Sequence, residues 1–446
     1  MSKIIIRNAK IINEGNTFDS DILIDNERIQ KIAPSISVDN NVCAIDANGR
    51  FLIPGMIDDQ VHCREPGLTH KADLVTESSA AIAGGITSFM EMPNVEPKTI
   101  NKSALDDKYN RAKDRCRTNY GFYLGANNTN IEVIKSLSLN DACGIKAFMG
   151  ASTGNMLIDD PSALELLFEH SPIMVVTHCE DSPTIWKNEA QAREKYGEDV
   201  PMSEHPHIRS DLACYKSSST AINLAKKYDA LLHVLHLTSA KEMELFSNKH
   251  RSEKRITAEV CVHHLWFDEN DYAVHGTNIK CNPAIKTNDD KMALIEALRS
   301  GKIDVIATDH APHTSEEKKS SYFDAPAGLP LVQHALPALF DLVAKQEISM
   351  ELVVDRACHA PADLFGIESR GYIREGYYAD LVLLDINKPN QVTKDNILYK
   401  CGWSPFDGHT FKTSIDTTIV NGTIVYDEGI LTGAIVGKRM TFNRAR

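Results

Sequence analysis

The chain has 446 residues, of which 42% are hydrophobic and 24% charged. This composition is typical of globular proteins and excludes a disordered, collagen-like or coiled-coil chain. The 61 acidic residues outnumber the 48 basic ones, which gives a formal net charge of −13. We therefore expect no nucleic-acid or anionic-membrane partner that depends on a basic surface.

The spacing of the cysteines indicates a reducing compartment. The ten cysteines are spread along the whole chain, and no Cys-x-x-Cys pair occurs. This spacing argues against a zinc ribbon or a thioredoxin-type redox pair. The N-terminus reads as a strand that contains Arg7 and Lys10, and neither a signal peptide nor an apolar span of eighteen residues follows. A soluble, cytoplasmic protein is expected.

In chain order, the first fifty residues form a small β module. Short strands are predicted within 3–12, 21–33 and 41–52. Glu14-Gly15 and Asn48-Gly49 mark turns between them.

From Ile53 to about Ile367, apolar runs alternate with helical stretches, which is the pattern of repeated βα units. The runs are 53–63, 85–93, 119–127, 143–150, 173–180, 230–238, 255–264 and 303–313. Helical periodicity is clearest at 71–83, 212–228 and 289–299. Eight parallel strands are the number that closes a barrel of this kind.

Strands return after Gly371, and Asn421-Gly422 predicts a hairpin. The sequence therefore predicts an α/β fold, a (β/α)8 TIM-type barrel at 53–370. A small β-sandwich domain built from both termini, 1–52 plus 371–446, is expected beside it.

Many of the predicted barrel strands end in polar residues of catalytic type. In a βα barrel the carboxyl ends of the strands open onto the active site, so these residues are expected to converge. They are Gln60, His62, Arg64, Asn94, Lys146, His178, His236, His263, His264, Asp309, His310 and His313.

Four of these residues indicate a metal centre. His178 and His236 terminate apolar runs, where an unpaired buried imidazole is costly. Lys146 lies in an apolar strand, where burial favours a neutral amine that can add carbon dioxide to form a carbamate; a surface lysine at a strand end is the alternative. Asp309 is a metal ligand, a general base or a buried partner of His310. Imidazoles and carboxylates with little thiolate suit catalytic zinc or a similar divalent ion.

Several motifs together resemble the amidohydrolase superfamily of metal-dependent cyclic-amide hydrolases. These are PGMID, THCED, HLTSA, ATDHAPH and ADLVLLD. Within this superfamily, VHCREPG, EMPN, CNPAIK and ATDHAPH are similar to the dihydroorotases. The resemblance covers essentially the whole chain.

The resemblance implies a role for each matching residue. It implies zinc, one or two ions, held by His62, Lys146 as its carbamate, His178, His236 and Asp309, with Asp309 also moving the proton. It implies substrate contacts from Arg64, Asn94, Asn282 and His313, and backbone groups for the ring at Ala327 and Gly328. The reaction implied is the reversible cyclisation of N-carbamoyl-L-aspartate to dihydroorotate in pyrimidine biosynthesis, with a metal-activated hydroxide as nucleophile in ring opening. A small-molecule partner and a homo-oligomer are expected.

Two departures from the pattern leave alternatives open. The first histidine of the family's His-x-His is Gln60 here, which weakens the first metal site unless Asp58 or Lys146 compensates. Gly150 stands where one dihydroorotase branch carries a bridging aspartate, which favours Lys146 as the bridging residue. Allantoinase or dihydropyrimidinase activity is one alternative, against which Arg64 argues because those substrates lack a carboxylate. A non-catalytic homologue that acts as a partner protein is the other.

Overall fold

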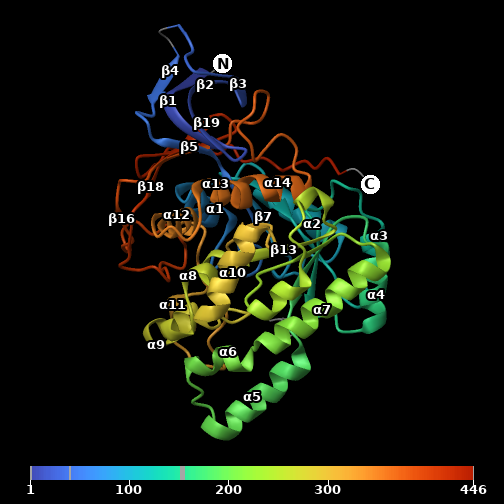
Figure 1. Cartoon of the computed structure of the whole chain (residues 1–446). Helices are drawn as coiled ribbons and strands as arrows, with labels where there is room; N and C mark the ends of the chain where they lie inside the picture. Colours follow the sequence, from blue (N-terminus) through green and yellow to red (C-terminus); the bar gives the residue numbers. More distant parts are fainter. Residues whose placement is uncertain (1–2, 40–41, 151–155, 445–446) are drawn as a thin grey trace.

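The protein consists of a parallel barrel and a sheet built from both ends of the chain (Figure 1). The computed structural model describes residues 3–39, 42–150 and 156–444. The barrel strands are β6 (Met56–Val61), β7 (Ile86–Glu91), β8 (Asn119–Phe122) continued by β9 (Leu124–Gly125), β10 (Ile145–Met149), β11 (Val175–Cys179), β12 (Leu232–Val234), β13 (Ile256–Cys261) and β14 (Val305–Ala307). All eight predicted runs contain one of these strands, so the predicted barrel is confirmed.

The barrel closes between its first and last strands. Neighbouring strands pair in parallel from β6 to β8 and from β9 to β14. A parallel bridge joins Val61 to His310, and the His62 amide donates to the His310 carbonyl oxygen at 2.7 Å. The Thr308 hydroxyl donates to Asp58 Oδ2 at 2.6 Å across the same seam. Closure therefore places the residues that follow β6 beside those that follow β14.

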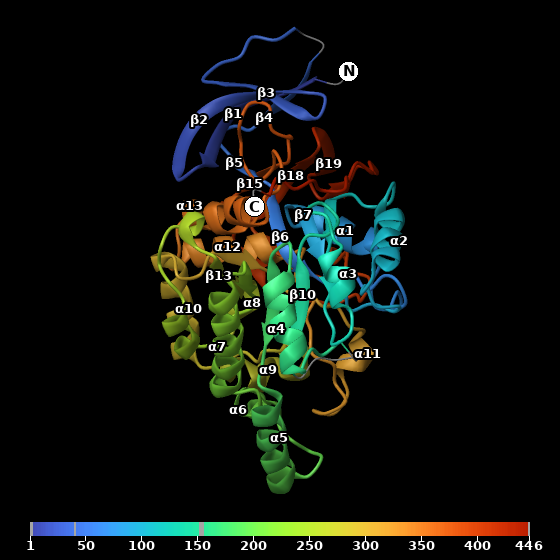
Figure 2. The ribbon, with the colours of Figure 1, turned by 90° about the vertical axis from the view of Figure 1, so that its right-hand side faces the viewer.

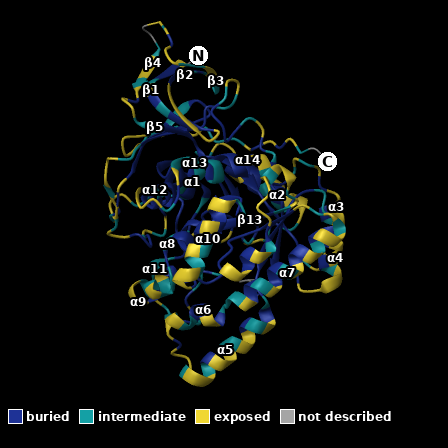
Figure 3. Cartoon of the chain, viewed as in Figure 1, coloured by how far each residue is buried: buried dark blue, intermediate teal, exposed yellow. Residues whose placement is uncertain are grey.

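The predicted helices form around the barrel: they are α1 (Leu74–Ala83), α7 (Asp211–Tyr228) and α10 (Asn288–Ser300). Helices α7 and α10 carry exposed residues on their outer faces, whereas α1 is almost entirely buried (Figure 3). Capping explains where they begin: the Asp73 carboxylate accepts from two amides of the first turn of α1, and Thr287 starts α10 with a capping box. Gly301, at φ +81°, ends α10 in the left-handed conformation that suits glycine.

Further helices fill the remaining connections. They are α2 (Lys102–Ala112), α3 (Ile131–Lys135), α4 (Pro161–His170), α5 (Ser182–Tyr196), α6 (His205–Ile208), α8 (Val262–Trp266), α9 (Tyr272–His275), α11 (Ser315–Lys318), α12 (Ala335–Ala344), α13 (Met350–Val354) and α14 (Ala360–Phe365). A π-helical turn, Asp355–His359, joins α13 to α14.

The terminal strands form one nine-stranded sheet. Its strands are β1 (Lys3–Asn13), β2 (Asn16–Asp25), β3 (Arg28–Ala33), β4 (Cys43–Asp46), β5 (Phe51–Pro54), β15 (Leu381–Asp385), β18 (Ser414–Val420), β19 (Thr423–Asp427) and β20 (Ile430–Leu431). The two ends of the chain meet where β5 pairs antiparallel with β15. A separate hairpin pairs β16 (Asn390–Gln391) with β17 (Thr410–Phe411). Both residues of the predicted Asn421-Gly422 turn have positive φ, as a tight hairpin requires.

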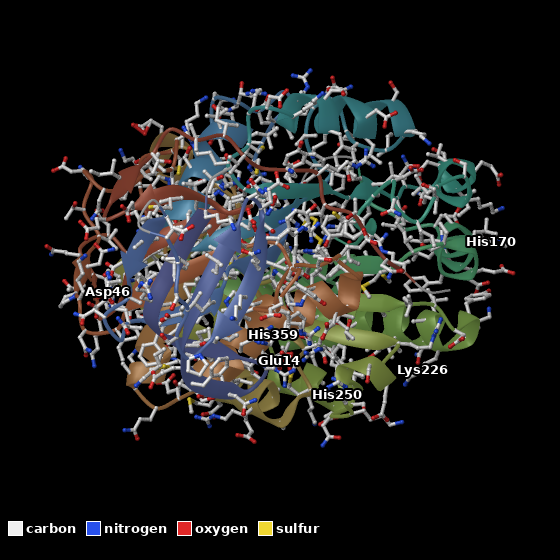
Figure 4. All side chains as sticks on the ribbon, turned by 90° about the horizontal axis from the view of Figure 1, so that it is seen from above. Glu14, Asp46, His170, Lys226, His250 and His359 are labelled. Carbon is white, nitrogen blue, oxygen red and sulfur yellow. The ribbon has the colours of Figure 1, made fainter. Side chains whose placement is uncertain are left out.

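Gly55 alone separates β5 from β6, so the chain passes directly from this sheet into the barrel. The carboxyl ends of the barrel strands therefore point away from β1–β3, toward α5 and α11 (Figure 2). At the opposite end, the β1–β2 turn contacts the barrel: the Glu14 amide donates to His359 Nε2 at 2.9 Å, and both residues lie close together in Figure 4.

Two predictions about the whole chain concern cysteines and membranes. All ten cysteines are free thiols, as expected. Among the described residues, no helix is long and apolar enough to cross a bilayer.

Candidate active site

A cavity of about 310 Å³ opens at the carboxyl ends of the barrel strands. Every residue to which the sequence assigned a site role lines it. These residues are His62, Arg64, Asn94, Lys146, His178, His236, Asn282, Asp309, His313, Ala327 and Gly328, and Gln60 joins them. Side chains separated by up to 266 positions in the chain therefore meet at one place, because the closed barrel brings its strand ends together.

One group of donors surrounds Asp309. His62 Nε2 lies 3.1 Å from Asp309 Oδ1, and Gln60 Nε2 donates to the same oxygen at 3.0 Å. Asn94 Oδ1 lies 2.9 Å from His62 Nδ1 and accepts its proton, which leaves Nε2 with a lone pair toward Asp309. Burial lowers the pKa of His62 to about 4, so this imidazole is neutral at neutral pH.

A second group is the pair His178 and His236. Nδ1 of His178 lies 3.0 Å from Nε2 of His236, so one ring nitrogen of each faces the other. Glu180 Oε2 lies 2.9 Å from the other nitrogen of His178 and fixes the orientation of the ring. Nδ1 of His236 is buried without a hydrogen-bond partner among the described residues. Burial also holds the pKa of His236 far below its ordinary value.

Lys146 is buried in β10, where its side chain is 1% exposed. Within the described residues its ammonium makes no hydrogen bond or ion pair, and it lies 4.7 Å from the centre of the Phe148 ring. Burial lowers its pKa to about 8, although Asp309 and Glu259 oppose that shift. The neutral amine is thus readily available, as the carbamate hypothesis requires.

Asp309 itself stays ionised. Burial raises the pKa of this carboxyl, but the contact with His62 and nearby positive charge, including Lys146, outweigh burial and keep the pKa below its ordinary value. The backbone here is strained, because Arg64, His236 and Asp309 have φ of +63°, +39° and +48°. Such left-handed residues other than glycine cost free energy and concentrate at functional sites.

One wall of the cavity is positively charged. Arg64 Nε donates to the Pro312 carbonyl oxygen at 3.1 Å, and Nη2 lies 3.0 Å from His313 Nε2. Nη1 of Arg64 makes no hydrogen bond to any described residue. Lys71 Nζ lies 3.0 Å from the other nitrogen of His313, and Lys98 also lines this cavity. This wall suits an anionic group on a ligand.

Asn282 offers a polar group to the same ligand. Its Oδ1 is buried and accepts no hydrogen bond from any described residue. Near it, the Gly328 amide donates to the Lys280 carbonyl at 2.8 Å, and the Ala327 carbonyl lies 3.1 Å from His313 Nε2. The amide of Gly328 and the carbonyl of Ala327 are therefore already engaged within the protein.

Some strand-end residues expected at the site lie elsewhere. His310 points away from the cavity and pairs with Glu77 at 2.7 Å, because adjacent strand residues face opposite sides. His263 and His264 are buried beside Cys261 and do not line the cavity. Sequence analysis missed Lys71 and Lys98, which come from loops and belong to no metal-binding pattern.

Comparisons with known proteins agree with this geometry. Residues 51–425 match the sequence pattern of the Amidohydrolase family. The chain belongs to the amidohydrolase family. It is 33% identical to dihydroorotases of Bacillus cytotoxicus and Bacillus thuringiensis, over 95% of this chain and 98% of theirs.

Solved structures give a similar result for the fold of this amidohydrolase. The L-hydantoinase (dihydropyrimidinase) from Arthrobacter aurescens superposes with a TM-score of 0.93 at 26% identity, covering 99% of this chain and 100% of that one. The dihydropyrimidinase from Brevibacillus agri gives a TM-score of 0.90 at 25% identity, with the same coverage. The chain is thus a cyclic amidohydrolase of the dihydroorotase and dihydropyrimidinase group.

Membership of this family implies a divalent metal ion, and the donors present fit one. His62 Nε2 and Asp309 Oδ1 converge on one side, and His178 Nδ1 faces His236 Nε2 on the other. Neutral imidazoles with a carboxylate are the donors of catalytic divalent-metal sites. Gln60 replaces an imidazole of the family pattern, and its amide nitrogen already donates to Asp309.

Proposed function

We propose that this amidohydrolase is a dihydroorotase. It interconverts N-carbamoyl-L-aspartate and dihydroorotate, with loss of water in the direction of ring closure. The observation that carries the proposal is the Arg64 guanidinium, which keeps free donors beside the metal-type donors, whereas Lys71 is paired with Glu317 at 2.8 Å. Dihydroorotate bears a carboxylate on its ring, whereas hydantoin and dihydrouracil do not. Only dihydroorotate can therefore pair a carboxylate with the free donors of the Arg64 guanidinium.

The chain's own residues divide the work between binding and proton transfer. Arg64 binds the substrate carboxylate with the donors that His313 and Pro312 leave free. Asn94 holds His62 in one tautomer, and the unpaired Asn282 Oδ1 accepts from an N–H of the ring. Asp309, ionised and next to the donors, takes a proton from the attacking water and delivers it to the departing ring nitrogen.

We further propose zinc, one or two ions per chain, held by His62, Lys146 as its carbamate, His178, His236 and Asp309. When bound, the metal polarises the amide carbonyl and lowers the pKa of water in the site. Free thiols throughout the chain are in keeping with a cytoplasmic enzyme.

A second candidate function is that of a hydantoinase or dihydropyrimidinase. The solved structures with TM-scores of 0.93 and 0.90 favour it. A third reading is a non-catalytic homologue, which Gln60 favours because the amide is a poorer ligand than an imidazole.

The three readings differ in substrate turnover. The purified chain, supplied with zinc, is assayed for ring opening of dihydroorotate, hydantoin, dihydrouracil and allantoin by loss of ultraviolet absorbance. We expect turnover of dihydroorotate alone. Turnover of hydantoin or dihydrouracil in its place supports the second reading, and bound metal without any turnover supports the third.

A further inference from the structure

A cluster of two carboxylates and one imidazole lies inside the barrel, among residues that do not line the cavity. Asp59 of β6, His233 of β12 and Glu259 of β13 are each fully buried, with 0% exposure. His233 Nε2 lies 3.3 Å from Asp59 Oδ2 and 3.8 Å from Glu259 Oε2. One ligand atom from each residue lies within 4.8 Å of the others. None of the three has a role in the proposed reaction.

Four buried atoms of this cluster lack a hydrogen-bond partner among the described residues: Asp59 Oδ1 and Oδ2, His233 Nε2 and Glu259 Oε2. Buried polar atoms are seldom left without a partner, because each costs free energy. Here all four belong to one small cluster.

The surrounding contacts orient the donors inward. His233 Nδ1 lies 2.7 Å from Thr257 Oγ1, and this hydroxyl donates its own proton to the Leu232 carbonyl oxygen at 3.3 Å. Nδ1 of His233 therefore carries a proton, and Nε2 faces the two carboxylates. Metal-binding histidines are commonly held in this way by a hydrogen bond to the other ring nitrogen. Burial alone would lower the pKa of His233, but Asp59 and Glu259 raise it to about 9. A metal ion bound here therefore displaces a proton from Nε2.

Hydrogen bonds hold the Glu259 carboxylate and the Asp59 backbone in place. Glu259 Oε1 accepts from the His236 amide at 3.1 Å and from the Cys261 thiol at 3.4 Å, which leaves Oε2 free. The Tyr123 hydroxyl donates to the Asp59 backbone carbonyl at 2.9 Å and fixes the backbone there. In the described part of the chain, no lysine or arginine forms an ion pair with either carboxylate.

Charge completes the argument. Two buried carboxylates this close repel one another unless a cation or a proton lies between them. One divalent ion brings the net charge of the cluster to zero. A proton on His233 leaves the charge at −1 unless Glu259, whose pKa burial raises to about 7, is protonated as well. In β6, Gln60 supplies an amide to the cavity and the preceding residue, Asp59, supplies a carboxylate inside the barrel.

We propose that Asp59, His233 and Glu259 bind a divalent metal ion, of the zinc class, inside the barrel and separately from the cavity. Asp59 contributes one carboxylate oxygen, His233 contributes Nε2 and Glu259 contributes a carboxylate oxygen. Because the site is fully buried, the ion is taken up as the chain folds and stabilises the barrel by joining β6 to β12 and β13.

Crystals of the full-length protein, prepared with zinc and recorded at the zinc absorption edge, test this directly. We expect an anomalous peak between Asp59, His233 and Glu259, in addition to density in the cavity. A map with zinc in the cavity and no peak between these three residues overturns the proposal and assigns the position to a proton on His233.

Metal content measured by mass spectrometry gives an independent test. We expect Glu259→Gln to lose one metal equivalent per chain relative to the unmodified protein. Glu242→Gln is the matched control, because Glu242 is equally buried but bonded to Ser218 and Ser239. His178→Asn, which alters the cavity, should keep the equivalent that Glu259→Gln loses. Equal metal content in the two glutamine variants contradicts the proposal.

Discussion

At the scale of single residues, the proposed function makes Arg64 the residue that selects a ring with a carboxylate. Arg64→Met removes the guanidinium donors that bind the substrate carboxylate. A charge-assisted hydrogen bond contributes about 1.5–3 kcal/mol, so KM for dihydroorotate should rise about 10- to 100-fold. Steady-state kinetics measure this, with circular dichroism as the control for folding. Arg64→Lys keeps the positive charge but loses the planar guanidinium. Its KM should lie between those of the parent protein and Arg64→Met. A KM within twofold of the parent protein contradicts the carboxylate-binding role.

Lys146 leads to a prediction about pH. Carbamate formation needs the neutral amine, and the pKa of Lys146 is about 8 because the side chain is buried. At a constant pressure of carbon dioxide, the initial rate of carbamate formation in metal-free protein should rise roughly fivefold from pH 7 to 8 and less than twofold from pH 8 to 9. Nuclear magnetic resonance with isotopically labelled carbon dioxide measures it.

The control for this experiment is Lys146→Ala. This variant should give no carbamate signal and should bind less metal than the parent protein. A rate that keeps rising steeply above pH 9 contradicts the lowered pKa, and an unchanged metal content in Lys146→Ala contradicts the role of Lys146 as a ligand.

At the scale of elements, the seam between β6 and β14 holds the site in shape. Asp58 is fully buried and accepts from the Thr308 hydroxyl, the Thr308 amide and the Gln60 amide. Asp58→Ala leaves these donors without an acceptor and should lower the free energy of unfolding by about 3 kcal/mol. Asp58→Asn retains an acceptor oxygen, so its free energy of unfolding should fall by only about 1 kcal/mol. Urea unfolding followed by circular dichroism compares the two, and equal losses contradict this account.

The barrel strands could be predicted from the sequence because strands buried on both faces read as continuous apolar runs. The metal-type residues could be predicted because each follows such a run, as His178 and Asp309 do. Lys71 and Lys98 could not be predicted as cavity residues, because their loops approach the cavity only in the folded chain. The cluster of Asp59, His233 and Glu259 could not be predicted either, because these residues come from three separate strands and nothing in the local sequence shows that they meet. His310 was misplaced because strand periodicity turns it away from Asp309.

At the scale of the whole molecule, a buried polar network joins the terminal sheet to the barrel. Arg370 and Asp380 form an ion pair in which both side chains are 3% exposed. Asp380 Oδ1 also accepts from the Asn421 amide of the β18–β19 hairpin at 2.8 Å, and Oδ2 accepts from Asn119 of β8 at 3.1 Å. One carboxylate therefore connects the C-terminal segment of the chain to the third strand of the barrel.

This arrangement predicts that Asp380→Ala lowers the free energy of unfolding of the whole protein. The change leaves the Arg370 charge buried and unpaired, which typically costs about 3–5 kcal/mol. Asp46→Ala is the matched control, because Asp46 is an exposed aspartate of the same sheet whose carboxylate makes only surface hydrogen bonds, so its loss should cost less than about 1 kcal/mol. Thermal and urea unfolding measure both variants. Because Asp380 lies outside the cavity lining, the folded Asp380→Ala protein should keep its KM. A free energy of unfolding equal to that of Asp46→Ala would show that the terminal sheet and the barrel are held together by other contacts.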